Sequence, residues 1–136
     1  MSLVRDAMLP EPAWLASDAT AQEAGALLAR PEVRAVFVCD EGENLTGVVT
    51  RKTLVREVVA LGRDPRETPL GEIAEKPYYT IDSSEQLDVA FHFLEEHDAE
   101  RVPVVDGSRL VGVLSRSVLQ RRLAEDEPPV EAQQHT

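Results

Sequence analysis

The sequence predicts an α/β fold made of two copies of one unit, each running strand, helix, strand, strand, helix. The first observation behind this prediction is an internal repeat, because residues 47–54 read GVVTRKTL and residues 112–119 read GVLSRSVL. The second is that short apolar runs typical of strands alternate, in each copy, with segments of helical periodicity. The third is length: 136 residues make one ordinary domain, or two halves each too small to bury a good core alone.

The repeat extends upstream of this motif, and its one gap lies where a gap is tolerated. Ser17 matches Ser83 and Val36 matches Val102 at an offset of 66 residues, whereas the motif itself matches at 65. The missing residue falls where the first copy reads DEGENL and the second DGSRL, both rich in turn residues. A length change in a hairpin loop costs little, so the two copies predict equivalent hairpins.

The predicted elements of the first copy follow an opening short helix or turn. They are a weak strand, a helix, a two-stranded hairpin and a closing helix, at residues 14–16, 20–30, 35–40 with 45–50, and 51–62. The helix at 20–30 follows from the spacing of its apolar residues. Gly62 is expected to stop the closing helix, since glycine is the usual residue just past a helix end.

The second copy predicts the same order. Residues 78–81 (YYTI) are aromatic and β-branched and predict a strand, and the following helix has Ser83 and Ser84 as candidate N-caps. Two apolar runs, RVPVVD and RLVGVLS, are joined at Asp106-Gly107, which is a strong hairpin signal. A last helix begins after Ser115.

Four segments result from this division. The first repeat is expected at 3–61, a linker at 62–68, the second repeat at 69–124, and an acidic C-terminal tail at 125–136. The linker prediction rests on GRDPRETPLG, which contains two prolines and two glycines. The tail is expected to be mobile.

Composition narrows the class of function. The 25 acidic residues outnumber 14 basic ones, and the net charge of -11 argues against nucleic acid and anionic membranes as partners. No apolar run approaches the roughly 18 residues of a membrane span. A lone Cys39 allows no internal disulfide, and the opening residues lack a signal-peptide core, so we expect a cytoplasmic protein.

The duplicated unit, with its VRDAM opening, its RVPVVD strand and its paired GVVTRKTL and GVLSRSVL motifs, resembles a tandem CBS (cystathionine β-synthase) domain pair over nearly all of residues 3–124. The resemblance implies two repeats packed sheet to sheet with pseudo-twofold symmetry. It also implies clefts that bind adenosine-containing ligands such as AMP, ADP, ATP or S-adenosylmethionine, a homodimer, and a regulatory module in place of an enzyme.

The residues themselves also indicate anion sites. Thr50 and Ser115 stand where a strand meets a helix, and the first backbone N–H groups of a helix attract phosphate. The alternative is a plain N-cap, which stabilises a helix by ~1 kcal/mol without any ligand. Two windows free of acid, one with Arg51 and the other with Arg116, together hold six of the 14 basic residues. Those two arginines are the better ligand candidates. Arg56, Arg121 and Arg122 lie beyond the first turn of their helices, where a basic side chain is more simply explained by the helix dipole and by an exposed helix face.

The resemblance assigns further site residues. Thr50 and Ser115 match the hydroxyl that contacts phosphate or ribose, but Thr53 and Val118 stand where the family usually has a ribose-binding Asp. Thr53 can make one such hydrogen bond, and Val118 none, which weakens the second cleft as a ribose site. The adenine is expected to pack against short strand segments. These comprise Leu15, Ala16, Ala35, Val36 and Phe37 in the first copy, and Tyr79, Thr80, Ile81, Val102 and Pro103 in the second.

Catalysis and metal binding have little support. Cys39 lies in an apolar strand, where a thiol is usually a small hydrophobe, and His92 and His97 lack the spacing of a helical metal site. Trp14, opposite Thr80 in the repeat, could stack on a base, but core packing between the halves is the favoured role.

We therefore expect a non-enzymatic sensor of an adenosine-type ligand that requires no cofactor, acts on an unknown protein effector and forms a homodimer. The alternative is a structural dimerisation or scaffold module with degenerate clefts.

Overall fold

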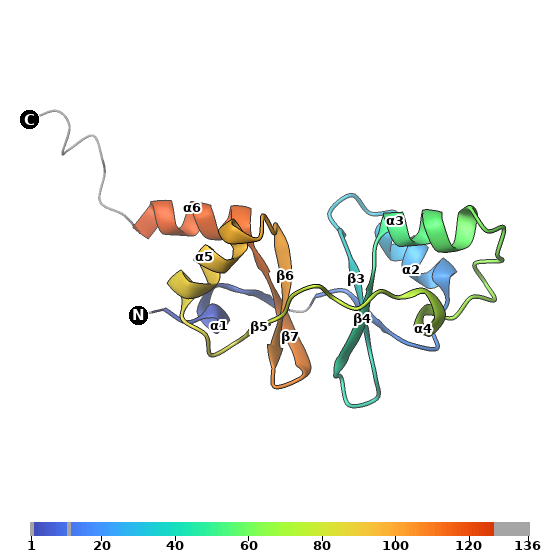
Figure 1. Cartoon of the computed structure of the whole chain (residues 1–136), viewed down its shortest axis with the longest axis horizontal. Coiled ribbons are helices and arrows are strands. Elements are labelled where there is room, and N and C mark those ends of the chain that lie inside the picture. The colour runs from blue at the N-terminus through green and yellow to red at the C-terminus, as the bar shows by residue number, and fades with distance from the viewer. Residues whose placement is uncertain (1, 11, 127–136) are drawn as a thin grey trace, which may run out of the picture.

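The computed structural model describes residues 2–10 and 12–126, and it consists of two lobes joined by two crossing segments. Each lobe is one β-sheet covered on its outer side by helices, and the two sheets meet at the middle of the molecule (Figure 1). This arrangement confirms the mixed α/β fold with two repeats. We call the lobe that holds the first hairpin lobe one, and the lobe that holds the second hairpin lobe two.

Lobe one has a three-stranded sheet in the order β2-β3-β4. Its strands are β2 (Trp14–Ala16), β3 (Val36–Cys39) and β4 (Leu45–Val49). Its helices are α2 (Ala21–Leu28), α3 (Arg51–Leu54), which continues as the π-helical segment η1 (Val55–Val59), and α4 (Leu70–Ile73). Gly62 has φ +68°, a conformation that glycine adopts without strain, and its prediction as a helix stop is confirmed.

Lobe two has a four-stranded sheet in the order β1-β7-β6-β5. Its strands are β1 (Leu9–Pro10), β5 (Ile81–Asp82), β6 (Arg101–Asp106) and β7 (Arg109–Ser115). Its helices are α1 (Val4–Ala7), α5 (Leu87–Glu96) and α6 (Arg116–Asp126). The predicted hairpin turn at Asp106-Gly107 is present, with Gly107 at φ +69°.

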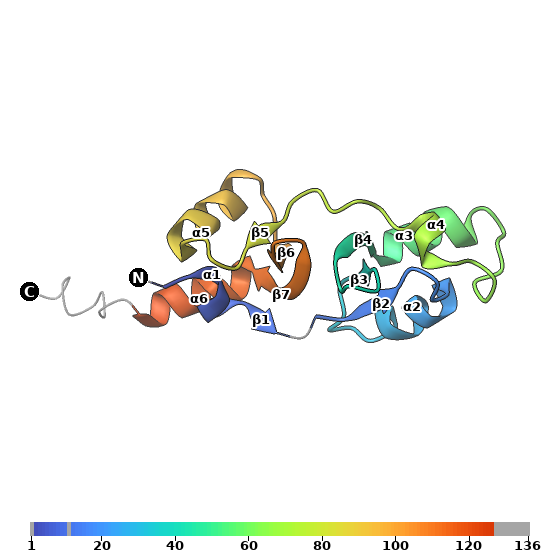
Figure 2. The ribbon, with the colours of Figure 1, turned by 90° about the horizontal axis from the view of Figure 1, so that it is seen from below.

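The two repeats exchange their opening helices. The apolar side chains of α1 belong to the core of lobe two, where Val4 is fully buried. Conversely α4, which opens the second repeat, contributes Leu70 and Ile73 to the core of lobe one. Figure 2 shows the two segments that cross between the lobes, one leading from β1 to β2 and the other from α4 to β5. Each lobe is therefore completed by the other repeat.

The hairpin tips also connect the lobes. Asn44 pairs with Arg109 as an isolated antiparallel bridge, and the Leu45 N–H donates to the Ser108 carbonyl at 2.9 Å. The Ser108 hydroxyl donates to Oδ1 of Asn44 at 2.8 Å. These bonds hold the two sheets together at the end where both hairpins turn.

Several local predictions are wrong. Residues 78–80 are not strand, and β5 begins only at Ile81. Helix α5 has Gln86 at its N-cap in place of Ser83 or Ser84, because the Ser84 hydroxyl and N–H both donate to the Asp82 carboxylate in the preceding turn. The side chain of Trp14 is 41% exposed and does not close the core between the lobes. Of the predicted tail, residues 125 and 126 continue α6, and 127–136 lie outside the described residues.

Candidate functional site

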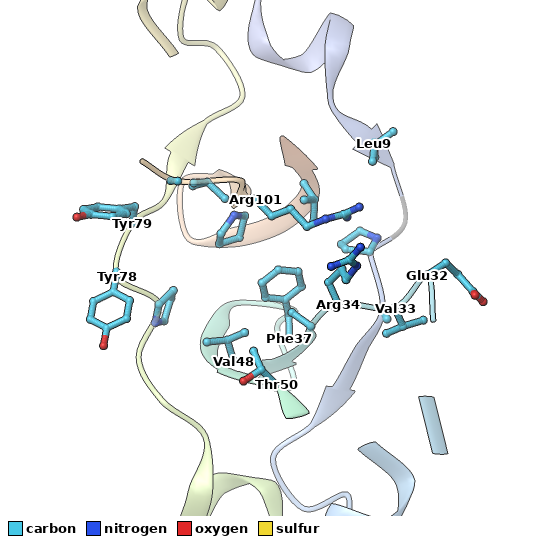
Figure 3. Close-up of a pocket in the computed structure, with 18 of the residues that line it drawn as sticks. Leu9, Glu32, Val33, Arg34, Phe37, Val48, Thr50, Tyr78, Tyr79 and Arg101 are labelled. Carbon is cyan, nitrogen blue, oxygen red and sulfur yellow. The ribbon is translucent and has the colours of Figure 1, made fainter. Parts of the chain in front are cut away.

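A cavity of about 570 Å³ lies between the two lobes (Figure 3). It is bordered by the strand edges of both sheets and by both crossing segments. Its volume is within the range of about 300–1,000 Å³ that is usual for small-molecule sites. Most of its walls are apolar, which also suits a small organic ligand.

The lining follows the internal repeat. Many lining positions occur as equivalent pairs, one from each copy of the repeat, so the two lobes contribute to the cavity in a pseudo-twofold arrangement. These pairs are Pro12 with Tyr78, Ala13 with Tyr79, Glu32 with Asp98, Val33 with Ala99, Ala35 with Arg101, Phe37 with Pro103, and Val48 with Val113. One continuous cavity therefore receives residues from both repeats.

The structure brings some of the expected site residues together here. The lining includes Thr50, Ala35, Phe37, Tyr79, Val102 and Pro103. The other expected residues are not among those that line this cavity: Leu15, Ala16, Val36, Arg51, Thr53, Thr80, Ile81, Ser115 and Arg116. Val36 is a buried core residue of lobe one, and Ile81 is one of lobe two.

Thr50 and Thr53 cap the first turn of α3. The Thr53 N–H donates to the Thr50 hydroxyl at 3.4 Å, and the Thr50 N–H donates to the Thr53 hydroxyl at 3.0 Å. Thr53 is only 1% exposed, so its hydroxyl is held inside this reciprocal cap. Thr50 is the member of the pair that also borders the cavity.

Ser115 occupies the equivalent position before α6. Its hydroxyl accepts from the Val118 N–H at 3.5 Å and lies 3.3 Å from the Ser117 hydroxyl. Ser115 is 2% exposed. The two strand-to-helix junctions thus share capping geometry, but only that of Thr50 reaches the cavity.

The two candidate arginines are engaged elsewhere. Nη2 of Arg51 donates to the Arg30 carbonyl at 2.9 Å, at the end of α2. Arg116 forms ion pairs with Asp98 and Glu100, at 3.2 and 3.6 Å. Hydrogen bonds from Ser117, together with the nearby arginines, hold the pKa of Glu100 below its usual value. Both arginines therefore stabilise the ends of helices and the loops beside them.

Two other arginines line the cavity, and the sequence analysis missed both. Arg34 comes from the segment before β3 and Arg101 from the start of β6. Figure 3 shows both side chains reaching toward the side where the β1–β2 segment passes. Among the described residues, no carboxylate forms an ion pair with either guanidinium. The arginine at the start of RVPVVD is visible in the sequence, but the arginines predicted above as anion ligands both lie at helix starts.

An aromatic group borders the same cavity in lobe two. The rings of Tyr79 and His97 have centroids 4.7 Å apart, and Phe93 packs edge-on against Tyr79 at 5.2 Å. The Nδ1 atom of His97 lies 2.9 Å from the Phe93 carbonyl, which fixes Nδ1 as the donor in neutral His97. Nε2 is then left to accept a hydrogen bond.

Within the described residues, no group of three His, Cys, Asp or Glu side chains is placed to hold a metal ion. Burial and the neighbouring acids Asp40 and Glu43 raise the pKa of the Cys39 thiol to about 11. A thiol with this pKa is a poor nucleophile near neutral pH. Among the same residues, no helix is long and apolar enough to cross a bilayer.

Known proteins resemble this chain over almost its full length. Hypoxic response protein 1 of Mycobacterium tuberculosis is 28% identical over 125 residues, which cover 92% of this chain and 87% of that protein. Its crystal structure, with two coordinated zinc ions, aligns with a TM-score of 0.75 at 27% identity, covering 90% of this chain and 99% of that one. CBS domain-containing protein YhcV of Bacillus subtilis is 30% identical over 115 residues, or 85% of this chain and 81% of YhcV.

A structure of CBSX2 in complex with AMP shares the fold. Its TM-score is 0.74 at 23% identity, and the alignment covers 92% of this chain and 98% of that one. A family model described as "CBS domain" matches the present sequence twice, over residues 4–60 and 70–125. These two matches contain both hairpins and both strand-to-helix motifs, and the chain belongs to the CBS domain family, of which it carries a tandem pair.

Proposed function

We propose that this protein is a regulatory module that binds an adenosine nucleotide in the cavity between its lobes and transmits its occupancy to a partner protein. One observation carries the proposal: apolar walls and two arginines without carboxylate partners among the described residues meet in a single cavity. A nucleotide needs both, because its base favours apolar surroundings and its phosphate favours guanidinium groups.

Each part of such a ligand has a candidate partner in the lining. The adenine would pack against Phe37 of lobe one, beside the crossing segment that carries Tyr79. The phosphate would bind Arg34 and Arg101, and bidentate contact with guanidinium is the strongest recognition available to it. CBSX2, which has the same fold, is known in complex with AMP, so the fold accommodates this class of ligand.

Ribose recognition would differ from the expected pattern. Thr53 and Val118 stand where the family usually has Asp, and the Thr53 hydroxyl already accepts a hydrogen bond within the helix cap that it forms with Thr50. Glu32 and Asp98 line the cavity and are equivalent in the two repeats. Their carboxylates can accept hydrogen bonds from ribose hydroxyls, so they would replace the usual Asp.

The phosphate ranks the candidate ligands. Arg34 and Arg101 can bind the phosphate of AMP, ADP or ATP, whereas S-adenosylmethionine has no phosphate to offer them. The proposal contains no catalytic step, and its ligand serves as a regulatory signal.

Thermal denaturation tests this proposal. A ligand that binds only the native state at 100 times its Kd stabilises that state by about 2.7 kcal/mol, so AMP, ADP or ATP at millimolar concentration should raise the Tm. Adenosine and inorganic phosphate, each alone, should raise it less. S-adenosylmethionine and NADH complete the panel.

A pair of variants locates the binding site. Arg101→Ala should weaken nucleotide binding at least about tenfold, because a hydrogen bond to a charged group contributes about 1.5–3 kcal/mol. Arg121→Ala, on the exposed face of α6, is the matched control and should bind as the wild type does. Equal affinity in the Arg101→Ala variant would contradict the placement of the phosphate.

The second candidate function is a structural scaffold with non-binding clefts. The capped and buried Thr53, together with the apolar Val118, favours it, since neither can recognise ribose. This function predicts no Tm shift with any compound of that panel. It also predicts that Thr50→Ala changes only stability.

A further inference from the structure

A short loop of lobe two joins the cavity to the start of α6. This loop, residues 97–100, connects α5 to β6, and we call it the lobe-two loop. His97, Asp98 and Ala99 line the cavity, and so does Arg101, the first residue of β6. Glu100, which lies between these residues in the chain, is not among the lining residues.

Glu100 is bonded to α6 instead. Its carbonyl accepts the Arg116 N–H at 2.8 Å, and its Oε1 accepts the Ser117 N–H at 3.2 Å. Its Oε2 lies 3.6 Å from Nε of Arg116. The first N–H groups of a helix have no partner within the helix, so Glu100 satisfies two of them at the start of α6. We call this set of contacts the Glu100 clasp.

The other end of the lobe-two loop is fastened to α5. The Asp98 N–H donates to the Glu95 carbonyl at 3.2 Å, and the Ala99 N–H donates to the Leu94 carbonyl at 2.9 Å. Asp98 has φ +49°, the left-handed conformation that often ends a helix. The loop is therefore bonded on both sides, and a displacement of its cavity-lining residues is passed to α6 through Glu100.

The internal repeat supplies a comparison within the molecule. Arg34 is equivalent to Glu100, and Arg51 to Arg116. Arg34 lines the cavity, and within the described part of the chain it forms no hydrogen bond to α3. One position thus carries a cavity residue in lobe one and a contact to the following helix in lobe two. Since both lobes share one fold, folding does not require the Glu100 clasp.

We propose that Glu100 is a positioning residue of the cavity and that it transmits the occupancy of the cavity to the start of α6. This role rests on the nucleotide site proposed above. A ligand that contacts Asp98 and Arg101 restrains the lobe-two loop, and the clasp extends that restraint to α6. Such coupling is reciprocal, so a weaker clasp lowers the affinity for the ligand by the factor by which the ligand strengthens the clasp.

The first test is the affinity of the full chain for ADP, measured by isothermal titration calorimetry. Glu100→Ala removes the side-chain contacts of the clasp and should weaken binding at least about fivefold, as coupling between two sites typically does. The loss of a negative charge near an anionic ligand would by itself strengthen binding. The predicted change therefore has the opposite sign to a direct effect of charge.

Two further variants separate the clasp from charge. Glu96→Ala removes the same charge from an exposed side chain at the end of α5, and it should bind ADP no more weakly than the wild type. Glu100→Gln keeps an oxygen that can accept the Ser117 N–H, so its affinity should stay within about twofold of the wild type. A Glu100→Gln variant as weak as Glu100→Ala would overturn the role of this hydrogen bond.

Amide hydrogen exchange measures the transmission to α6. ADP should slow the exchange of the Arg116 and Ser117 amides in the wild type and leave it unchanged in Glu100→Ala at a saturating concentration. Without ligand, Glu100→Ala should exchange these amides at least about fivefold faster than the wild type, because local opening requires less free energy when the clasp is weakened. Glu96→Ala should match the wild type in both measurements.

Circular dichroism and a cooperative thermal transition establish that each variant is folded. A Glu100→Ala variant that binds ADP as tightly as the wild type overturns the positioning role alone, and the nucleotide site then stands. ADP that binds the wild type but does not slow exchange at the start of α6 overturns the transmission. A wild type that binds no nucleotide overturns the proposed function, and the role of Glu100 with it.

Discussion

At the residue scale, the two glycines of the repeated motif explain why the motif recurs. A Cβ atom on Gly112 would lie 2.7 Å from Sδ of Met8 and 2.9 Å from the Leu9 carbonyl oxygen, and one on Gly47 would lie 2.8 Å from Cβ of Ala74. These neighbours lie close beside the two strands: β1 pairs with β7 in one sheet, and Glu75, which follows Ala74, forms a bridge to Val48 of β4. Glycine is needed at both positions because another backbone approaches closely there.

Gly112→Ala should therefore destabilise the protein. Overpacking of this kind costs about 1–3 kcal/mol, and here one of the opposing atoms is backbone. Gly25→Ala is the matched control, since its Cβ would meet nothing closer than 3.7 Å, and alanine in a helix should stabilise by up to about 1 kcal/mol. Urea unfolding at one fixed protein concentration measures both. A Gly112→Ala variant as stable as the wild type would show that Met8 and Leu9 can move away from β7.

The thiol of Cys39 gives a second prediction at this scale. The side chain is 1% exposed, and its pKa is raised to about 11 by burial and by two neighbouring acids. Iodoacetamide at pH 8 should modify it only when the chain unfolds, so the rate of modification should rise with urea along the unfolding transition. Rapid modification of the native protein would instead indicate that β3 opens locally.

At the element scale, the first hairpin depends on an ionised side chain. The Asp40 carboxylate accepts hydrogen bonds from the N–H groups of Gly42 and Asn44, at 2.9 and 3.0 Å. The backbone hydrogen bond from Asn44 is the main cause that lowers the pKa of Asp40. Because Asn44 also pairs with lobe two, this carboxylate supports the contact between the hairpin tips.

This geometry predicts an acid-sensitive hairpin. A carboxyl whose pKa is lowered by folding stabilises the native state above its unfolded pKa of about 4, and this stabilisation is lost as the pH falls through the folded value. Asp40→Asn should therefore be less stable than the wild type at pH 7, and the difference should shrink toward pH 3. Urea unfolding at pH 7, 5, 4 and 3 checks this. A difference that stays constant over that range would show that charge at Asp40 is unimportant.

At the scale of the whole molecule, the lobes and the sequence repeats have different boundaries. Helix α4, from the start of the second repeat, provides two core residues of lobe one, and Leu70 is fully buried. Burying a side chain of this kind stabilises by about 1.5–3 kcal/mol. The first repeat by itself lacks this helix and would expose the apolar face of α1.

A fragment of residues 12–76 should therefore fold better than a fragment of residues 3–61. The longer fragment contains the whole sheet of lobe one together with α4. We expect a cooperative thermal transition and dispersed amide resonances for 12–76, and neither for 3–61. Equal folding of the two fragments would mean that α4 is dispensable for the core of lobe one.

The sequence by itself determined most of the elements. The spacing of apolar residues located α2, α5, α6 and both hairpins. This is possible because a helix or strand that buries one face repeats its apolar residues at a fixed interval along the sequence. The errors were also local: the tyrosines at 78 and 79 favour strands by propensity, but they lie in the crossing segment beside the cavity, where no neighbouring strand pairs with them.

The tertiary structure decided the candidate site. Thr50, Phe37 and Tyr79 could be named from the repeat and from a family resemblance, whereas Arg34 and Arg101 could not be recognised as partners. They lie far apart in the chain and come together only because the two sheets meet and the opening helices are exchanged. Periodicity in the sequence predicts which side of a helix or strand faces a core. A cavity between two lobes depends on how those elements pack against each other, which a local sequence pattern does not predict.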